Sequence, residues 1–308
     1  MSEDNLEEST GLWQSEWISS DILEFYKVSN IIFKGKTKYQ KVTVLETLPY
    51  GKCLLLDDKI QSSILDEYFY HETLVHPSLA MHGNAKRVAV IGGGEGATIR
   101  EVEKWRSVEE IMMVEIDKEV VEICSKYLGE INDGAFSDAR LRLIIDDGRR
   151  WLSDQEDNSI DVLIVDVTDP LEGGPSYLLF TREFYELASR KLTRNGVLAT
   201  QATSPVHNEL SYSSIKKTLS SVFKYVTSLQ AFIKSYSSMW GFLFASNDNI
   251  LEISPEKINE RLRSNGVSGL RFYSGDIHFS LRCLAEKYER LIKVEGRIIE
   301  DSSPIFIK

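Results

Sequence analysis

Five apolar segments between residues 87 and 203 are separated by stretches with a helical, amphipathic pattern. They read RVAVIGGG, EIMMVEID, LRLIIDDG, DVLIVDVTDP and GVLATQAT. A strand that is apolar at every position is buried on both faces, and strands that alternate with helices form a parallel sheet. The segments therefore predict a doubly wound α/β sheet, in which ligands bind at the carboxyl ends of the strands.

The chain before residue 83 has a different pattern. From Trp13 to about Leu74 short alternating runs are broken by Gly35, by residues 49–51 and by residues 57–58, which is typical of an antiparallel β unit with hairpins. A helical stretch follows over residues 68–81. We predict an acidic flexible tail over residues 1–12, an N-terminal β-strand domain over residues 13–82 and a Rossmann-like catalytic domain over residues 83–308. Two later runs, YVTSLQAFI and GFLFAS, could add a terminal hairpin to its sheet.

Charge and composition narrow the possible partners and compartments. The 308 residues carry a net charge of -11, which would repel nucleic acid and anionic membranes and attract cations. No apolar run approaches the ~20 residues of a membrane span, and the N-terminus lacks a signal-peptide pattern. Cys53, Cys124 and Cys283 are far apart and odd in number, so they are predicted to be reduced and structural. We predict a cytoplasmic protein.

A glycine-rich turn joins the first apolar strand to the next helix. Residues 92–97 read GGGEGA, and Gly92, Gly94 and Ala97 suit a tight turn that lets a ligand approach the backbone and the helix N-terminus. The turn alone is a weak signal, since it is also compatible with a structural role. Glu115 strengthens the ligand interpretation, because it ends the next strand 23 positions beyond Gly92, where an acid can hold ribose hydroxyls. The alternative for Glu115 is an exposed carboxylate at a strand end.

The third strand also ends in acids. Asp147, followed by Gly148, could accept a hydrogen bond from an adenine amino group, or it could cap the helix that follows. No phosphate-binding motif is present, and Glu95 inside the glycine turn would repel a pyrophosphate. A nucleoside that carries a cation in place of phosphates fits better, which indicates an S-adenosyl sulfonium compound.

Two carboxylates end the fourth strand. Burial of Asp166 and Asp169 without need would cost several kcal/mol, so the pair indicates a cationic partner. Asp169 has a structural alternative as a turn residue before Pro170. The loop over residues 171–180, LEGGPSYLLF, could be a lid over these acids or a passive surface loop.

Together these motifs resemble the spermidine/spermine synthase family of aminopropyltransferases. The resemblance extends from Trp13 to about Ser246 and depends on YQ, LDDKIQ, DEYFYHE, GGGEG, EID, DVTDP and Gln201. It implies a methyltransferase-like catalytic fold and the transfer of an aminopropyl group from decarboxylated S-adenosylmethionine to a polyamine nitrogen, with release of methylthioadenosine. The donor is a co-substrate, and neither a cofactor nor a metal is expected. The resemblance also implies a homodimer or homotetramer assembled through the N-terminal unit.

The resemblance assigns roles to individual residues. It implies that the donor is bound by Gln40, His71, Glu95, Glu115, Asp147 and Gly148. It implies that the polyamine is bound by Tyr70, Asp166, Asp169 and Tyr236, with Asp166 nearest the attacking amine and therefore catalytic.

Departures from the usual family pattern bear on the acceptor. Spermidine synthases usually have Asp-Gly-Gly where this chain has Glu95-Gly96-Ala97, and Gln where His71 stands. The segment DPLEGGPSY resembles plant thermospermine synthases, whereas EID and DDG resemble ordinary spermidine synthases. We predict spermidine as acceptor and thermospermine as product, with spermidine or spermine synthase as alternatives. More remote are S-adenosylmethionine-dependent N-methyl transfer to a small amine and a catalytically inactive nucleoside-binding module.

Overall fold

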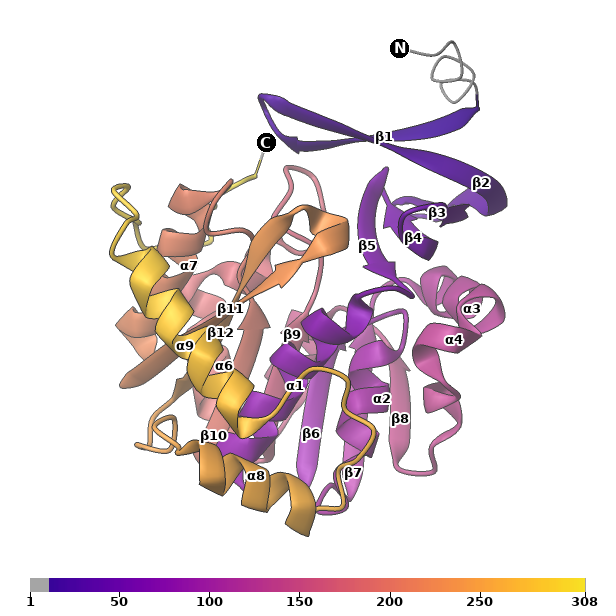
Figure 1. Ribbon diagram of the computed structural model, residues 1–308. Coiled ribbons are helices and arrows are strands. Elements are labelled where there is room, and N and C mark those ends of the chain that lie inside the picture. Colours follow the sequence, from indigo (N-terminus) through magenta and orange to yellow (C-terminus); the bar gives the residue numbers. More distant parts are fainter. Residues whose placement is uncertain (1–10, 308) are drawn as a thin grey trace.

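The computed structural model describes residues 11–307, which form two sheets flanked by helices (Figure 1). Residues 1–10 of the predicted tail lie outside the described residues. The smaller sheet has five antiparallel strands in chain order: β1 (Leu12–Ser19), β2 (Ile22–Lys36), β3 (Lys41–Thr47), β4 (Gly51–Leu56) and β5 (Lys59–Ser63). The predicted antiparallel N-terminal unit is confirmed.

The turn between β4 and β5 shows why this sheet forms hairpins. Leu56 pairs with Lys59, so Asp57 and Asp58 are a two-residue loop, and both have positive φ angles of 47° and 67°. Two positive φ values match the right-handed twist of antiparallel strands, and Asp is among the residues that adopt them most readily. This turn places Lys59 at the start of β5.

The larger sheet has seven strands in the order β11-β12-β10-β9-β6-β7-β8. Five are parallel: β6 (Arg87–Gly92), β7 (Glu110–Glu115), β8 (Leu141–Ile145), β9 (Ile160–Asp166) and β10 (Leu192–Gln201). The antiparallel pair β11 (Tyr225–Ile233) and β12 (Ser238–Ser246) adds the predicted hairpin at one edge. Because the chain runs outward from β6 to β8 and then returns to β9, the strand order reverses between β6 and β9, which is where such sheets bind ligands.

Helices cover both faces of this sheet. One face packs against α1 (Glu67–His82), α2 (Ala97–Glu103), α8 (Pro255–Ser264) and α9 (Gly275–Glu289). The other packs against α5 (Gly148–Asp154), α6 (Arg182–Lys191) and α7 (Glu209–Val222). The predicted Rossmann-like fold class is confirmed. Strand β8 departs from the expected burial, since it is an edge strand and its Leu143 and Ile145 are each 43% exposed.

The two sheets are connected by apolar contacts, and the helix that follows the smaller sheet packs on the larger one. Val44 and Leu54 of the smaller sheet pack with Val120 of α3 (Lys118–Tyr127) and with Leu128, just before the short helix α4 (Gly129–Asn132). Helix α1, which the sequence groups with the N-terminal unit, packs mainly on α2, β10 and β11. Single 3₁₀ turns are η3 (Ala135–Ser137), η4 (Tyr177–Phe180) and η5 (Lys234–Tyr236).

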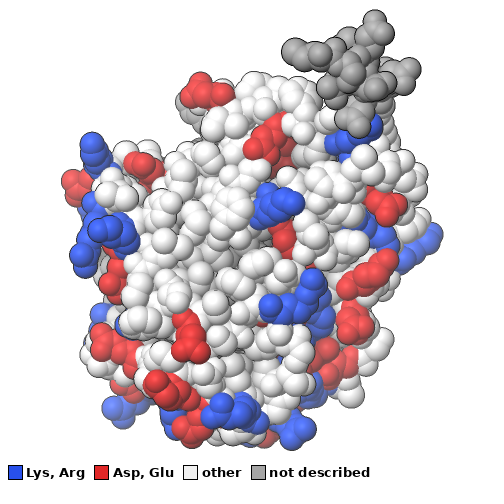
Figure 2. All heavy atoms as spheres, viewed as in Figure 1, with Lys and Arg blue, Asp and Glu red and all other residues white. Residues whose placement is uncertain are grey.

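Charged side chains are mixed on the visible face of the molecule. Figure 2 shows acidic and basic residues interspersed along the left, lower and right edges of this face, with a few between them. The net charge of -11 is therefore not gathered into one acidic field on this face. Within residues 11–307, no helix has the length and apolar character that crossing a membrane requires.

Candidate active site

A cavity of about 220 Å³ lies where the two sheets meet. Its walls come from the glycine turn after β6, the ends of β7, β9 and β10, the loop after residue 170, and strands β1, β4 and β5 of the smaller sheet. In Figure 1 the smaller sheet sits above one end of the larger sheet, so it forms a roof over the strand ends. Most of the predicted site residues line this cavity: Gln40, Tyr70, Glu95, Glu115, Asp147, Gly148, Asp166, Asp169 and Tyr236.

The glycine turn has a backbone that other residues could not adopt. Gly92, Gly93 and Gly96 have φ angles of 85°, 73° and 88°. A Cβ on Gly92 would lie 2.1 Å from the carbonyl oxygen of Asp166, and one on Gly94 would lie 3.2 Å from Glu115 Oε2. The turn therefore brings its backbone against the ends of both neighbouring strands, as a nucleoside site of this fold requires.

Glu115 is a half-buried residue at the end of β7. Burial raises its pKa to about 7, and the nearby Asp117 and Glu95 carboxyls act in the same direction. The backbone N–H of Asp117 donates to Glu115 Oε1 over 2.9 Å. Asp117 in turn accepts hydrogen bonds from Thr37 Oγ1 at 2.5 Å and Gln40 Nε2 at 3.3 Å. These bonds place Gln40, in the loop between β2 and β3, at the end of the cavity that contains Glu115.

Asp147 has the structural role that the sequence left open. Its side chain caps α5 by accepting a hydrogen bond from the backbone N–H of Arg150 at 2.9 Å. The same residue also lines the cavity, so the cap and a ligand contact are compatible. A Cβ on Gly148 would lie 2.4 Å from Ile91 Cγ2, which explains the glycine at that position by packing.

Asp166 is a buried carboxyl held by two hydroxyl groups. Tyr70 donates to its Oδ1 over 2.7 Å, and Thr98 donates to its Oδ2 over 2.5 Å. Burial raises the pKa of Asp166, the nearby Glu95 raises it further, and His71 lowers it. Two hydroxyl donors on one carboxylate fix its orientation. An amine that enters from the cavity would therefore meet a carboxylate that is already oriented.

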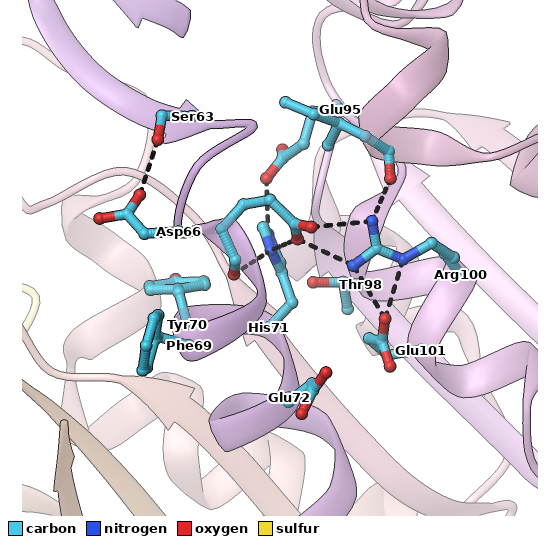
Figure 3. Close-up of polar contacts among 12 residues, drawn as sticks. Ser63, Asp66, Phe69, Tyr70, His71, Glu72, Glu95, Thr98, Arg100 and Glu101 are labelled. Atoms are coloured by element: carbon cyan, nitrogen blue, oxygen red, sulfur yellow. Dashed lines mark hydrogen bonds and ion pairs between the residues drawn. The ribbon is translucent and has the colours of Figure 1, made fainter. Parts of the chain in front are cut away.

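His71 links two acids on opposite sides of its ring. Its Nδ1–H donates to Glu67 Oε2 at 2.9 Å, and its Nε2–H donates to Glu95 Oε1 at 2.8 Å (Figure 3). Burial lowers the pKa of His71, but the hydrogen bonds to Glu67 and Glu95 outweigh it and raise the pKa to about 10. His71 is therefore an imidazolium at neutral pH. Arg100 holds Glu67 from the other side through both carboxylate oxygens.

Ligand atoms of His71, Glu95 and Asp166 lie within 4.8 Å of one another. These residue types can bind a metal, but an imidazolium that donates from both nitrogens has no lone pair to offer. The cluster as it stands is a hydrogen-bonded charge network with two acids and one cation, and its excess negative charge suits a cationic ligand. The expectation that no metal takes part stays a prediction.

Asp169 and Tyr236 lie in the same cavity, beyond Asp166. Asp169 accepts hydrogen bonds from Gln201 Nε2 at 3.2 Å and from Thr203 Oγ1 at 3.4 Å, and burial raises its pKa to about 6. The Tyr236 hydroxyl donates to the carbonyl of Gln61, and its ring contacts that of Tyr70 edge-on at 6.1 Å between centroids. Asp169 is thus a half-buried residue whose carboxyl is hydrogen-bonded to Gln201 and Thr203.

The loop after Pro170 is tied to the C-terminal end of the chain. The backbone N–H of Ile307 donates to the Pro170 carbonyl over 2.9 Å, and the rings of Tyr177 and Phe306 are 5.4 Å apart. Inside the loop, Ser176 Oγ donates to the carbonyl of Asp169 over 3.0 Å. These contacts anchor both ends of the segment beside the cavity, and a lid role for it stays a prediction.

Four residues of the site have no assignment from the sequence. Thr98 and Glu67 act on Asp166 and His71, as described above. Glu16 of β1 is 8% exposed and lines the cavity, and it accepts hydrogen bonds from the Tyr26 hydroxyl and the Ile60 N–H. Lys59 lines the cavity from β5. The sequence signal for Glu16 is limited to an acidic residue within a short alternating run. Its burial could not be predicted, because it depends on how the smaller sheet packs over the larger one.

Comparison with known proteins identifies the family of this fold and site. Residues 67–255 match the Spermine/spermidine synthase domain, and residues 12–63 match the Spermidine synthase tetramerisation domain. The chain belongs to the spermine/spermidine synthase family. This confirms the family that the sequence motifs indicated.

Relatives and solved structures of the spermine/spermidine synthase family match nearly the whole chain. The polyamine aminopropyltransferase of Sulfurisphaera tokodaii is 36% identical over 296 residues, which are 96% of this chain and 98% of that protein. That of Aeropyrum pernix is 41% identical over 300 residues, 96% and 95% of the two chains.

Two crystal structures of spermidine synthases share the fold. One was solved in complex with the transition-state analogue AdoDATO; it has a TM-score of 0.83 and 31% identity, and it covers 91% of this chain and 95% of its own. The Thermotoga maritima enzyme has a TM-score of 0.80 and 30% identity, with 91% and 94% coverage.

Proposed function

We propose that this protein transfers the aminopropyl group of decarboxylated S-adenosylmethionine to a polyamine nitrogen and releases methylthioadenosine. The observation that carries the proposal is the group formed by Asp166, Tyr70 and Thr98, a buried carboxylate oriented by two hydroxyl donors beside a nucleoside-type glycine turn. Aminopropyl transfer in polyamine synthesis is also supported by relatives named polyamine aminopropyltransferase and by structures of spermidine synthases.

The donor end of the cavity supports a sulfonium nucleoside without a carboxylate. Glu115 is available for ribose hydroxyls and Asp147 for an adenine amino group, with Gln40 nearby. Glu95 lies in the same cavity, where it would repel the carboxylate of intact S-adenosylmethionine and attract the free ammonium group of the decarboxylated form. This charge favours aminopropyl transfer over methyl transfer.

The reaction requires an amine lone pair near a buried carboxylate. A free amine has a pKa of ~10.4, so exposing its lone pair at pH 7 costs roughly 4–5 kcal/mol. The nitrogen attacks the propyl carbon next to sulfur, the C–S bond breaks, and its electrons return to sulfur to give the neutral thioether. Asp166 orients the amine and accepts its proton as the N–C bond forms and the nitrogen becomes more acidic. Alignment and removal of water account for the rest of the rate.

We propose spermidine as the acceptor and thermospermine as the product, with spermidine synthase or spermine synthase as the alternatives. The support for a triamine is that three carboxyls line one cavity: Asp166 and Glu16, which are buried, and Asp169, which is half-buried. A site built for a third ammonium group discriminates against a ligand that lacks it. The choice of thermospermine over its isomer spermine depends on the resemblance of the loop after residue 170 to plant thermospermine synthases.

Acceptor specificity is tested by steady-state kinetics with decarboxylated S-adenosylmethionine and putrescine, spermidine or spermine. We expect kcat/KM for spermidine to exceed that for putrescine by about 10²-fold or more, because a polar site without its ligand group stays unpaired. Chromatography that separates thermospermine from spermine identifies the product. A higher kcat/KM for putrescine would make the protein a spermidine synthase. Spermine as the main product would mean that spermidine enters with the opposite end first.

Glu115→Gln is expected to weaken methylthioadenosine binding by roughly 1–2 kcal/mol, since a carboxylate accepts hydrogen bonds from a diol more strongly than an amide does. Because the pKa of Glu115 is about 7, the wild-type protein should bind methylthioadenosine more weakly as the pH falls from 8 to 6, and the variant should lose this dependence. Calorimetry over this pH range measures both effects. An unchanged dissociation constant would leave Glu115 with a structural role.

We also propose assembly of identical chains through β1 and β2. In the register of these strands, Trp17 pairs with Leu23 and Ser15 with Phe25, so Trp13, Trp17 and Phe25 lie on one face. Their exposed fractions are 44%, 57% and 61%. A group of exposed aromatic side chains favours burial against another copy, and residues 12–63 match the Spermidine synthase tetramerisation domain.

A further inference from the structure

Lys59 places a positive charge inside a cavity that is otherwise suited to cations. It is the first residue of β5 and lines the cavity together with Glu16 and Asp169. Burial raises the pKa of Glu16 to about 7 and that of Asp169 to about 6, and in both cases the Lys59 ammonium group opposes the increase. The same ammonium therefore acts on the two carboxyls that lie beyond Asp166.

The Lys59 ammonium is available to a ligand. Among residues 11–307, no ion pair or side-chain hydrogen bond includes its Nζ atom, although Glu16 and Asp169 are both close enough to be affected by it. The two carboxyls instead accept hydrogen bonds from other groups: Glu16 from Tyr26 and Ile60, and Asp169 from Gln201 and Thr203. Lys59 thus contributes a fixed charge to the cavity rather than a closed salt bridge.

We propose that Lys59 is a specificity-determining residue that sets an upper limit on the charge of the acceptor. The inference rests on the proposed aminopropyl transfer, because it assumes that the polyamine extends from Asp166 past Asp169 toward Glu16. Three carboxyls and one ammonium then face the acceptor. This set suits a triamine whose reacting nitrogen has lost its proton and whose other two nitrogens remain charged.

A tetraamine meets a different balance of charge in the same cavity. It brings one more ammonium group than spermidine. The other carboxyls on the cavity wall are those assigned to the donor, Glu95, Glu115 and Asp147, and the exposed Asp57, whose Oδ1 already accepts the Lys41 N–H. A further ammonium group that extends past Glu16 and Asp169 must therefore approach Lys59. Repulsion between like charges is strong where water is excluded, and a built-in repulsive group is an effective way to reject a competing ligand. Lys59 therefore favours departure of the tetraamine product and disfavours its use as the next acceptor.

The experiment compares Lys59→Met with the wild-type protein. Methionine keeps an unbranched side chain of similar length and removes the charge. At a saturating concentration of donor, kcat/KM is measured with putrescine, spermidine and spermine, which carry two, three and four amine nitrogens. The expected increase in kcat/KM of Lys59→Met over wild type is larger for an acceptor with more charge. It is small for putrescine and at least about tenfold for spermine, with stronger inhibition by added tetraamine.

Two controls separate charge from packing. Lys59→Arg keeps the charge and should preserve the wild-type order of acceptors. Lys36→Met makes the same substitution at an exposed residue of β2 that does not line the cavity, and it should change none of the three values. A loss of kcat/KM that is equal for all three acceptors in Lys59→Met, or no change at all, would overturn the proposal.

A binding measurement keeps this test separate from that of the proposed function. Calorimetry with each polyamine in the presence of methylthioadenosine requires no turnover. If the wild-type protein converts no acceptor, the proposed function fails, while the affinities still report on Lys59. The role of Lys59 is supported if Lys59→Met increases the affinity for spermine more than the affinity for putrescine, each compared with wild type. An equal change in affinity for both ligands contradicts it.

Discussion

Asp166→Asn is expected to lower kcat by at least about 100-fold while the fold and the affinity for methylthioadenosine stay close to wild type. The substitution is nearly isosteric, and the amide oxygen can still accept a hydrogen bond from Tyr70 or Thr98. It removes the negative charge that stabilises the attacking nitrogen as it becomes cationic. It also replaces one oxygen with an amide NH₂ group, which donates and cannot accept a proton.

The measurement is steady-state kinetics at saturating acceptor, with circular dichroism and calorimetry as checks on fold and donor binding. Asp154→Asn is a matched control, since Asp154 is an exposed residue at the end of α5 that does not line the cavity. The control should retain wild-type kinetics. A kcat of Asp166→Asn close to that of wild type would remove Asp166 from the mechanism.

Gly92→Ala is expected to destabilise the protein by roughly 2–5 kcal/mol, the sum of a left-handed backbone conformation and an overpacked contact. The φ angle of Gly92 is 85°, and the new Cβ would lie 2.1 Å from the carbonyl oxygen of Asp166. Gly92 and Asp166 are register partners in neighbouring strands, and the N–H of Gly93 donates to the same carbonyl over 2.8 Å. Relief of the contact must therefore move Asp166 itself.

The structure offers a control that separates the two contributions. Gly134 has a φ angle of 81°, and a Cβ there would meet no atom within 4 Å. Gly134→Ala should thus cost only about 1–2 kcal/mol and leave kcat unchanged. Thermal or denaturant unfolding gives the stabilities. In Gly92→Ala a displacement of Asp166 by about 1 Å should also reduce kcat on the order of 100-fold, so equal behaviour of the two variants would contradict this account of the turn.

The parallel sheet and the acids at the ends of its strands could be predicted because both depend on local sequence. Apolar segments separated by helices indicate a parallel sheet, and parallel strands bring their carboxyl ends to one edge. Glu115, Asp147 and Asp166 follow three such segments and do line one cavity. The exposure of Leu143 on β8 could not be read in this way, because an edge strand has the same apolar pattern as a central one.

Contacts between the two sheets could not be predicted from local sequence patterns. Glu16 and Lys59 come from opposite ends of a small β unit, and only the packing of that unit over the strand ends brings them to the cavity that contains Asp169. The link between Thr98 and Asp166 joins residues 68 positions apart. Periodicity reports which face of an element is buried, and it carries no information on the partner across a tertiary contact.

The sequence by itself determined the fold class, the family and the acids at the strand ends, because strand burial, turn geometry and motif spacing are properties of short segments. Only the tertiary structure decided the charge states and partners of those residues. His71 is an imidazolium because Glu67 and Glu95 lie on either side of its ring, and Glu115 has a pKa of about 7 because desolvation disfavours its charged form. Burial and electrostatic interactions depend on groups brought together from distant parts of the chain, and their effects become defined only when the fold is complete.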